Sequence, residues 1–139
     1  MKKTTVSESC IYDIPKIKDP RGNLSVIEND VIPFKMNRVY YLYDVPSNSS
    51  RGGHAHIQQL EFLIALSGSF DVLLDDGEEK KVVTLNKPDK GLLIVEGIWR
   101  ELNNFSAGSV CLVISSDVFI EEDYIREYKD FLKYKNQFS

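Results

Sequence analysis

The sequence predicts an all-β domain that ends in one helix. Short runs rich in Val, Ile, Leu, Tyr and Phe recur about every 8 to 12 residues between turn signals, a pattern typical of sandwiches and barrels. No helical segment separates the runs, so we expect antiparallel sheets in a sandwich, jelly roll or barrel, folds that often enclose a ligand cavity. We place strands near residues 10–14, 24–28, 38–44, 53–56, 60–66, 69–74, 80–85, 91–95, 98–103 and 109–115.

Turn signals separate the strands. Pro20-Arg21-Gly22-Asn23 and the stretch from Pro46 to Ser50 interrupt the apolar runs early in the chain. Asp76-Gly77 between two apolar runs is a strong hairpin signal. We therefore expect one domain over 1–139, with its jelly roll at about 8–117.

The period changes after Asp117. Apolar residues then recur at helical spacing, at Tyr124, Ile125, Tyr128, Phe131 and Leu132. The acidic residues 121–123 suit the first turn of a helix, because they complement its dipole. We predict a helix at about 121–135, packed by one stripe against the sheets.

Length and charge narrow the class of protein. A chain of 139 residues is long enough to bury roughly two thirds of its unfolded surface as one domain. A formal net charge of −4 and a pI near 5.2 argue against a nucleic-acid or membrane-surface partner, so local arginines must meet any anionic ligand. The sequence contains no apolar signal core and no run of roughly 18 apolar residues that could span a membrane, so we expect a cytoplasmic protein.

The two cysteines predict free thiols. Cys10 and Cys111 lie far apart in the sequence. Cys111 sits in the apolar run 110–114, where a buried thiol is more common than a disulfide.

The two histidines are the first candidates for chemistry. His54 and His56 are separated by one residue in a predicted strand, so both imidazoles lie on one face. Such a pair can exchange protons near neutrality or bind a metal through neutral nitrogens. Arg51 lies close by in the sequence and adds a charge. The alternative is that the rings cap a loop or complete hydrogen bonds at a strand edge.

The spacing around the histidines resembles the first motif of the cupin superfamily, whose fold is a jelly roll called the double-stranded β-helix. His54-x-His56 is followed by Glu61 and Gly68 at the intervals of that motif. In the second motif, Arg100 stands where a metal-binding cupin supplies another histidine. Two histidines and a carboxylate can still form an open three-ligand metal site. Because a guanidinium has no lone pair for a metal and suits phosphate, we predict a site without a metal.

A closer resemblance covers nearly the whole chain. The segments that carry it are Asp19-Pro20-Arg21-Gly22-Asn23-Leu24, Ile32-Pro33-Phe34, Arg38-Val39-Tyr40-Tyr41, Arg51-Gly52-Gly53-His54-Ala55-His56, Leu74-Asp75-Asp76-Gly77, Gly91-Leu92, Ile98-Trp99 and Glu122-Asp123-Tyr124-Ile125-Arg126. Together they look like the dTDP-sugar 3,4-ketoisomerase family, small cupins of bacterial deoxysugar pathways for surface polysaccharides. The resemblance implies that dTDP-4-keto-6-deoxyglucose is converted to a dTDP-3-keto-6-deoxyhexose by a homodimer without metal or cofactor.

The resemblance also implies roles for the catalytic residues. Moving the ketone requires removal of the C3 proton, an enediol or enediolate, and delivery of a proton to C4. We expect His56 to act as the base at C3 and His54 to carry the proton to C4. Tyr40 then donates to a sugar oxygen.

Five further residues are expected to bind the substrate. Arg38 and Arg51 would hold the diphosphate through charge-assisted bonds. Arg100 is expected to contact phosphate or sugar, and Glu61 to act beside His56 as a carboxylate or a neutral hydrogen-bond partner. Trp99 either lines the site or belongs to the core.

Three alternatives remain. The related dTDP-sugar 3,5-epimerases pair a histidine with an aspartate and use a separate tyrosine acid, an arrangement that the sequence does not reveal. A non-catalytic sugar-nucleotide-binding cupin would keep the arginines, and a metal-dependent oxygenase would need bound iron or manganese. For the homodimer, we expect residues 9–15 to add a strand across the two-fold axis.

Overall fold

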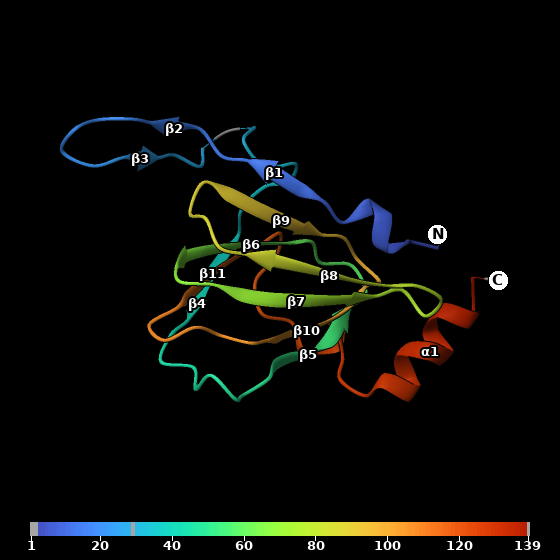
Figure 1. The fold of residues 1–139 in the computed structure, drawn as a ribbon. Helices are drawn as coiled ribbons and strands as arrows, with labels where there is room; N and C mark the ends of the chain where they lie inside the picture. The colour runs from blue at the N-terminus through green and yellow to red at the C-terminus, as the bar shows by residue number, and fades with distance from the viewer. Residues whose placement is uncertain (1–2, 29, 139) are drawn as a thin grey trace.

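The computed structural model describes residues 3–28 and 30–138 (Figure 1). Its strands are β1 (Ile11–Asp13), β2 (Lys16–Ile17), β3 (Leu24–Ser25), β4 (Arg38–Leu42), β5 (Arg51–His56), β6 (Glu61–Ser67), β7 (Phe70–Asp75), β8 (Lys80–Leu85), β9 (Lys90–Ile94), β10 (Trp99–Asn103), β11 (Val110–Ser115) and β12 (Tyr124–Ile125). The helical elements are the short 3₁₀ turns η1 (Val6–Glu8) and η2 (Glu121–Asp123) and the helix α1 (Tyr128–Asn136). All ten expected strands are present with small changes at their ends, and β2 and β12 are additional.

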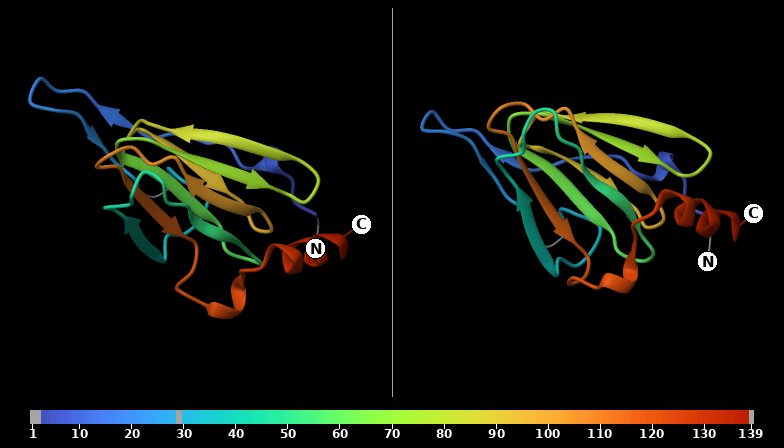
Figure 2. Two further views of the ribbon diagram at one scale, coloured as in Figure 1. Left: turned by 60° about the horizontal axis from the view of Figure 1, so that its bottom comes forward. Right: turned by 90° about the horizontal axis from the view of Figure 1, so that it is seen from below.

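Two five-stranded antiparallel sheets face each other (Figure 2). The first sheet has the order β1-β9-β6-β11-β4, and the second has the order β12-β5-β10-β7-β8. The main core lies between them and includes Leu63, Val72, Leu92 and Val113. This arrangement confirms the predicted all-β jelly roll with a C-terminal helix.

Strand β6 is buried on both faces because it lies in the middle of the first sheet. Leu63 joins the core between the sheets, whereas Phe62 and Ile64 join a second apolar cluster on the outer face. The neighbouring β9 places Gly91 opposite Ile64, where a Cβ atom would lie 2.0 Å from the Phe62 ring. Any larger residue at position 91 would displace this ring.

The predicted hairpin at Asp76-Gly77 joins β7 to β8. The Asp76 carboxylate accepts the backbone N–H groups of Glu78 and Glu79, and Gly77 has a φ of +94°. That left-handed backbone favours glycine. The hairpin prediction is confirmed.

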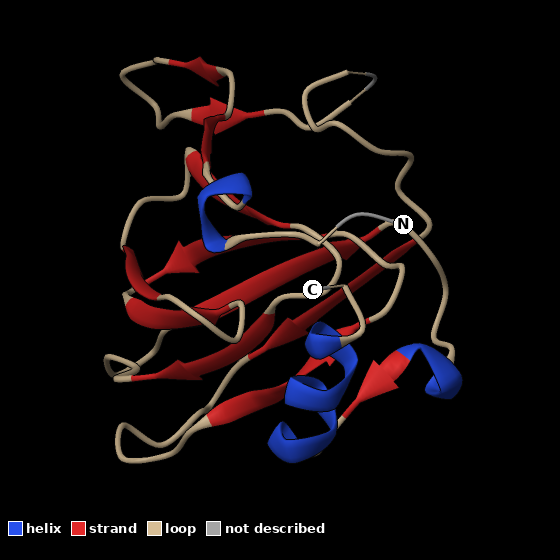
Figure 3. Cartoon of the chain, turned by 90° about the vertical axis from the view of Figure 1, so that its right-hand side faces the viewer, coloured by secondary structure: helices blue, strands red, loops and turns tan. Residues whose placement is uncertain are grey.

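The prediction that the helix begins at residue 121 is wrong. Residues 121–123 form η2, and β12 then pairs with β5, with Tyr124 opposite His56. The Asp123 carboxylate accepts backbone N–H groups of the 57–59 loop, so the acidic stretch serves loop contacts rather than a helix dipole. The helix α1 begins at Tyr128 and lies beside β5 and β12 (Figure 3).

The N-terminal strand β1 forms one edge of the first sheet. β1 pairs with β9 of the same chain, and Ile14 behind it is buried. Because β1 is the edge strand of the first sheet, the expectation that residues 9–15 add a strand across a two-fold axis stays a prediction. The element that projects is the β2–β3 hairpin, with Ile17 and Leu24 exposed (Figure 1).

Both cysteines are free, as predicted, and Cys111 is buried between the sheets. No helix among the described residues is long and apolar enough to cross a membrane.

Candidate active site

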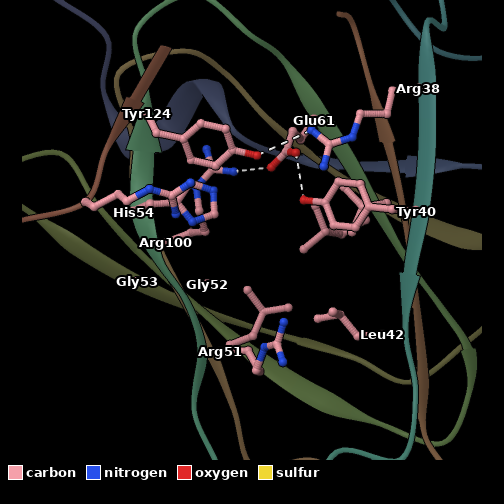
Figure 4. A pocket seen from close by; sticks show the side chains of 14 residues that line it. Arg38, Tyr40, Leu42, Arg51, Gly52, Gly53, His54, Glu61, Arg100 and Tyr124 are labelled. Atoms are coloured by element: carbon pink, nitrogen blue, oxygen red, sulfur yellow. Dashed lines mark hydrogen bonds and ion pairs between the residues drawn. The ribbon is translucent and has the colours of Figure 1, made fainter. Parts of the chain in front are cut away.

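A cavity of about 260 Å³ opens between the two sheets (Figure 4). β4 contributes Arg38 and Tyr40, and β5 contributes Arg51 and His54. Both pairs follow from strand geometry, because alternate side chains share a face. Arg38 and Tyr40 therefore both point into the cavity.

The two histidines lie on one face, as predicted, but only one of them reaches the cavity. Their Nε2 atoms are 3.2 Å apart. His54 lines the cavity, whereas His56 is 0% exposed and lies behind it. The residue expected to act as the base at C3, His56, is therefore not the one that faces the cavity.

The environment of His54 favours its neutral form. Burial lowers the pKa of His54 to about 2, and the positive charge of Arg100 and the neighbouring His56 lower it further. A neutral imidazole has a free lone pair, which is the form that accepts a proton.

Asp123 holds the buried histidine from the other side. Its Oδ2 atom is 3.0 Å from Nδ1 of His56. This contact was not predicted from the sequence, because the helical spacing after Asp117 placed Asp123 in a helix. The segment Glu122 to Arg126 contributed to the family resemblance, and that was the only signal for this residue.

The Glu61 carboxylate connects three strands in the floor of the cavity. Its Oε2 atom accepts Tyr40 Oη at 2.9 Å and Ser115 Oγ at 3.0 Å, and its Oε1 atom accepts Arg100 Nη1 at 2.5 Å. Burial raises the pKa of Glu61, but the nearby His56 and the Arg100 charge outweigh it and hold the pKa well below its usual range. Glu61 is therefore a charged acceptor, and the neutral alternative is not supported.

Arg100 is 1% exposed and is turned inward to Glu61. Its Nε and Nη2 atoms also donate to the Ile98 carbonyl. Arg100 borders the cavity, but its strongest partner is a carboxylate of the same chain. The expected contact of Arg100 with a phosphate or the sugar stays a prediction.

Burial and the Glu61 charge raise the pKa of Tyr40 far above its usual range, so Tyr40 stays protonated. Its hydroxyl donates to Glu61. Tyr40 therefore lines the cavity with a neutral proton donor.

Cationic and aromatic side chains surround the entrance. Arg38 donates to Tyr124 Oη at 3.3 Å and lies over the rings of Tyr40 and Phe119. Figure 4 shows Arg51 across the open space from Arg38. Tyr124 and Arg126 also line the cavity, although the sequence analysis gave neither of them a role. Arginines at the rim suit an anionic ligand such as a diphosphate.

Trp99 does not line the cavity. It lies on the opposite face of β10 from Arg100 and packs against Tyr128 and Phe131, with ring centroids 5.4 and 5.8 Å away. Its Nε1 donates to Glu101. The expected role in substrate binding is wrong, and the core alternative is the one that the structure supports.

A metal fits this site poorly. Ligand atoms of His54, His56 and Glu61 lie within 4.8 Å of one another, the spacing of a possible metal site. The Arg100 guanidinium already occupies the Glu61 carboxylate, and the His56 Nδ1 atom is engaged by Asp123. A metal cation bound to Glu61 would displace the Arg100 guanidinium. That buried positive charge would then lie unpaired beside the metal.

A known protein family matches nearly the whole chain. The family described as "FdtA: WxcM-like, C-terminal" matches residues 7–136. This chain belongs to that family. It is 42% identical over 128 residues to a TDP-4-oxo-6-deoxy-alpha-D-glucose-3,4-oxoisomerase of Aneurinibacillus thermoaerophilus, a match that covers 91% of this chain and 92% of that protein.

Solved structures of 3,4-ketoisomerases are similar to this chain in fold and sequence. A 3,4-ketoisomerase from Helicobacter canadensis is 41% identical, with a TM-score of 0.90 over 93% of this chain and 98% of that chain. The sugar 3,4-ketoisomerase QdtA from Thermoanaerobacterium thermosaccharolyticum, in complex with TDP, is 35% identical, with a TM-score of 0.93 over 96% and 98% of the two chains. The predicted resemblance to the 3,4-ketoisomerases is confirmed.

The residue pattern of a 3,5-epimerase is present in the structure, although the sequence did not reveal it. His56 is paired with Asp123, and Tyr40 and Tyr124 lie nearby, so a histidine, an aspartate and a tyrosine do come together. The sequence did not reveal this arrangement because His56 and Asp123 are 67 positions apart. The preference for a ketoisomerase rests on the family and not on the absence of this pair.

Proposed function

We propose that this chain is a sugar-nucleotide 3,4-ketoisomerase that converts dTDP-4-keto-6-deoxyglucose to a dTDP-3-keto-6-deoxyhexose. One observation carries the proposal: in a member of this family, a neutral histidine faces a cavity with arginines at its rim. The curated relative is named for this type of reaction on this type of substrate. The cavity of about 260 Å³ is smaller than the roughly 300 to 1,000 Å³ of drug-sized sites, so it suits the sugar, with the nucleotide outside.

His54 removes the C3 proton. It lines the cavity and is neutral before substrate binds. The negative charge that develops on the enediolate favours the imidazolium, so the basicity of His54 rises as the proton moves. The same residue returns a proton to C4, which places both transfers on one face of the sugar.

Tyr40 and the rim arginines support the reaction. The Tyr40 hydroxyl is protonated and can donate to a sugar oxygen as negative charge develops there. Arg38, Arg51 and Arg126 hold the diphosphate and so position the sugar over His54. Glu61 and Arg100 neutralise each other and hold Tyr40 in place.

The active form is a homodimer. The outer face of the first sheet leaves Val39, Tyr41 and Leu66 roughly half exposed, beside a groove that Met36 and Leu112 also line. An exposed apolar surface of this kind is typical of an interface. A second copy is the partner, as the family resemblance implies. We expect Tyr41→Glu to reduce the mass in light scattering from dimer to monomer, and an unchanged mass would exclude this face as the dimer interface.

The protein acts in the cytoplasm, where its cysteines stay reduced.

The decisive experiment follows the ketone directly. NMR of the purified protein with dTDP-4-keto-6-deoxyglucose in deuterated buffer should show the ketone move from C4 to C3 and deuterium enter at C4. Turnover should survive dialysis against a strong chelator. Exchange at C3 and C5 with the ketone still at C4 would identify a 3,5-epimerase, and binding without exchange would identify a non-catalytic cupin.

A further inference from the structure

The buried histidine has a defined place in a chain of contacts. His56 is 0% exposed and touches no part of the cavity surface. Its Nδ1 atom is 3.0 Å from Asp123 Oδ2, and its Nε2 atom is 3.2 Å from His54 Nε2. The order from the cavity inward is therefore His54, His56, Asp123.

The Asp123 carboxylate determines the direction of this chain. Its Oδ1 atom accepts the backbone N–H of Gln58 at 2.8 Å, and its Oδ2 atom accepts that of Gln59 at 3.2 Å. Because both oxygens act as acceptors, the third contact is also accepted, and Nδ1 of His56 carries the hydrogen. In this tautomer, the uncharged ring of His56 presents a lone pair at Nε2.

That lone pair determines the tautomer of His54. Nε2 of His54 donates to Nε2 of His56, so the Nδ1 atom of His54 carries the free lone pair. Nδ1 of His54 has no hydrogen-bond partner among the described residues. Gln59 Oε1 is the only fully buried side-chain polar atom without a partner among those residues, so Nδ1 of His54 is not fully buried. Nδ1 is therefore open to the cavity, where a base is needed.

We propose that Asp123 is a positioning residue that acts through His56 to hold Nδ1 of His54 bare toward the substrate, and that His56 takes over the positive charge during turnover. The proposal deepens the proposed function and rests on it.

The transfer balances in two coupled steps. The C3–H bond breaks and an Nδ1–H bond forms on His54, while the electron pair left at C3 becomes part of the enediolate. The Nε2–H bond of His54 then breaks and an Nε2–H bond forms on His56. The imidazolium of His56 is flanked by the Asp123 carboxylate and, at 3.6 Å, by that of Glu61. Both transfers reverse when C4 is protonated, and the hydroxyl proton moves from O3 to O4 of the enediolate, so that the ketone is left at C3.

A purely structural role is the alternative, because Asp123 also anchors the loop at residues 58 and 59. The two readings differ in what they predict for titration. The charged and titratable groups that face the histidine pair are Asp123, Glu61, Arg100, Arg126, Tyr40 and Tyr124. Of these, only Asp123 contacts Nδ1 of His56.

The first test needs no substrate. Nitrogen-15 NMR of the histidine rings should show His56 protonated at Nδ1 and His54 protonated at Nε2 in the free protein. In Asp123→Asn, the hydrogen-bonded Nδ1–H signal of His56 should be lost or should move to ordinary shifts. If the wild-type protein has the opposite tautomers, the proposal is wrong whatever the protein catalyses.

The second test is kinetic. Asp123→Asn should lower kcat by about 10²-fold or more, leave the affinity for TDP within about twofold, and shift the acidic limb of the kcat profile to lower pH, because a lost negative charge destabilises imidazolium. The matched control is Asp75→Asn. Asp75 is also buried and accepts Tyr128 Oη and the Gly77 N–H, but it lies away from the cavity. The control should lose stability without a shift in the profile.

The outcomes separate the two proposals. Wild-type protein that does not move the ketone refutes the proposed function, and the NMR result still decides the role of Asp123. Active wild-type protein together with Asp123→Asn of unchanged kcat and unchanged profile refutes the positioning role alone. Reduced kcat in both aspartate variants with no shift of the profile would show a structural role and also refute the proposal.

Discussion

The second sheet has one face toward the cavity and one toward α1, and the two faces are stabilised differently. On the cavity face, His54 and Arg100 are held by hydrogen bonds of 2.5 to 3.3 Å to specific partners. On the outer face, Ala55, Trp99 and Phe131 form a small cluster without ionised groups. A substitution on the first face changes charge and proton positions, whereas a substitution on the second changes mainly packed volume. Function is therefore sensitive on one side of the same strands and tolerant on the other.

The largest expected effect is at the cavity histidine. His54→Asn should lower kcat by about 10²- to 10⁴-fold, the usual contribution of a general base, while TDP affinity changes by less than about threefold. Steady-state kinetics and calorimetric titration with TDP measure the two quantities. Near-normal turnover in this variant would show that His54 is not the base.

The buried ion pair should dominate stability on the cavity face. Arg100→Met leaves the Glu61 carboxylate buried without its cation, and we expect the free energy of unfolding to fall by about 3 to 5 kcal/mol in urea denaturation. The double variant Arg100→Met/Glu61→Leu should recover part of this loss. Arg21→Met, at the exposed pair with Asp19, is the control and should change nothing measurable. Equal effects in the two single variants would contradict a special role for burial.

Nucleotide binding should depend on the rim. Arg51→Ala should weaken TDP binding by about 1.5 kcal/mol, roughly tenfold, the lower end for a hydrogen bond to a charged group, because Arg51 is exposed. Isothermal titration calorimetry measures this change, and Arg21→Ala serves as the control outside the site. An affinity that falls only after metal removal would contradict the arginine-based site.

The outer face should show the opposite behaviour. Trp99→Phe should reduce the free energy of unfolding by about 1 to 2 kcal/mol, because it removes buried volume and the hydrogen bond to Glu101. Turnover should stay within about twofold of wild type. A large loss of kcat in a folded variant would place Trp99 back among the site residues.

The lowered pKa of His54 should also make stability depend on pH. The pKa of His54 is about 2 in the folded protein, so between its ordinary value of 6.5 and pH 5 only the unfolded chain takes up this proton. The contribution of His54 to the free energy of unfolding is therefore fully present above pH 6.5. It decreases as the pH falls, by up to about 1.4 kcal/mol per pH unit. Denaturation between pH 7 and 5 should show this slope in wild type and a shallower one in His54→Gln. Equal slopes would contradict the lowered pKa.

The sequence by itself determined the strands, the hairpin at Asp76-Gly77 and the shared face of the two histidines. These features depend on contacts between near neighbours and on side-chain alternation along one strand, which a single chain segment contains. The order and spacing of the family segments were also readable, and they identified the ketoisomerase family.

Only the tertiary structure decided which of the equivalent residues reaches the cavity. His54 and His56 share a face, but Asp123, which is distant in sequence, holds His56 behind the cavity. The same reason explains the misplaced helix start, because the apolar spacing at Tyr124 and Ile125 suits a helix until β5 offers them a strand partner. It also explains why Trp99 was placed in the site. Whether Trp99 faces the cavity or the core depends on which side of β10 is covered by the helix α1. Burial and charge pairing arise from residues brought together across the fold, so no local pattern contains them.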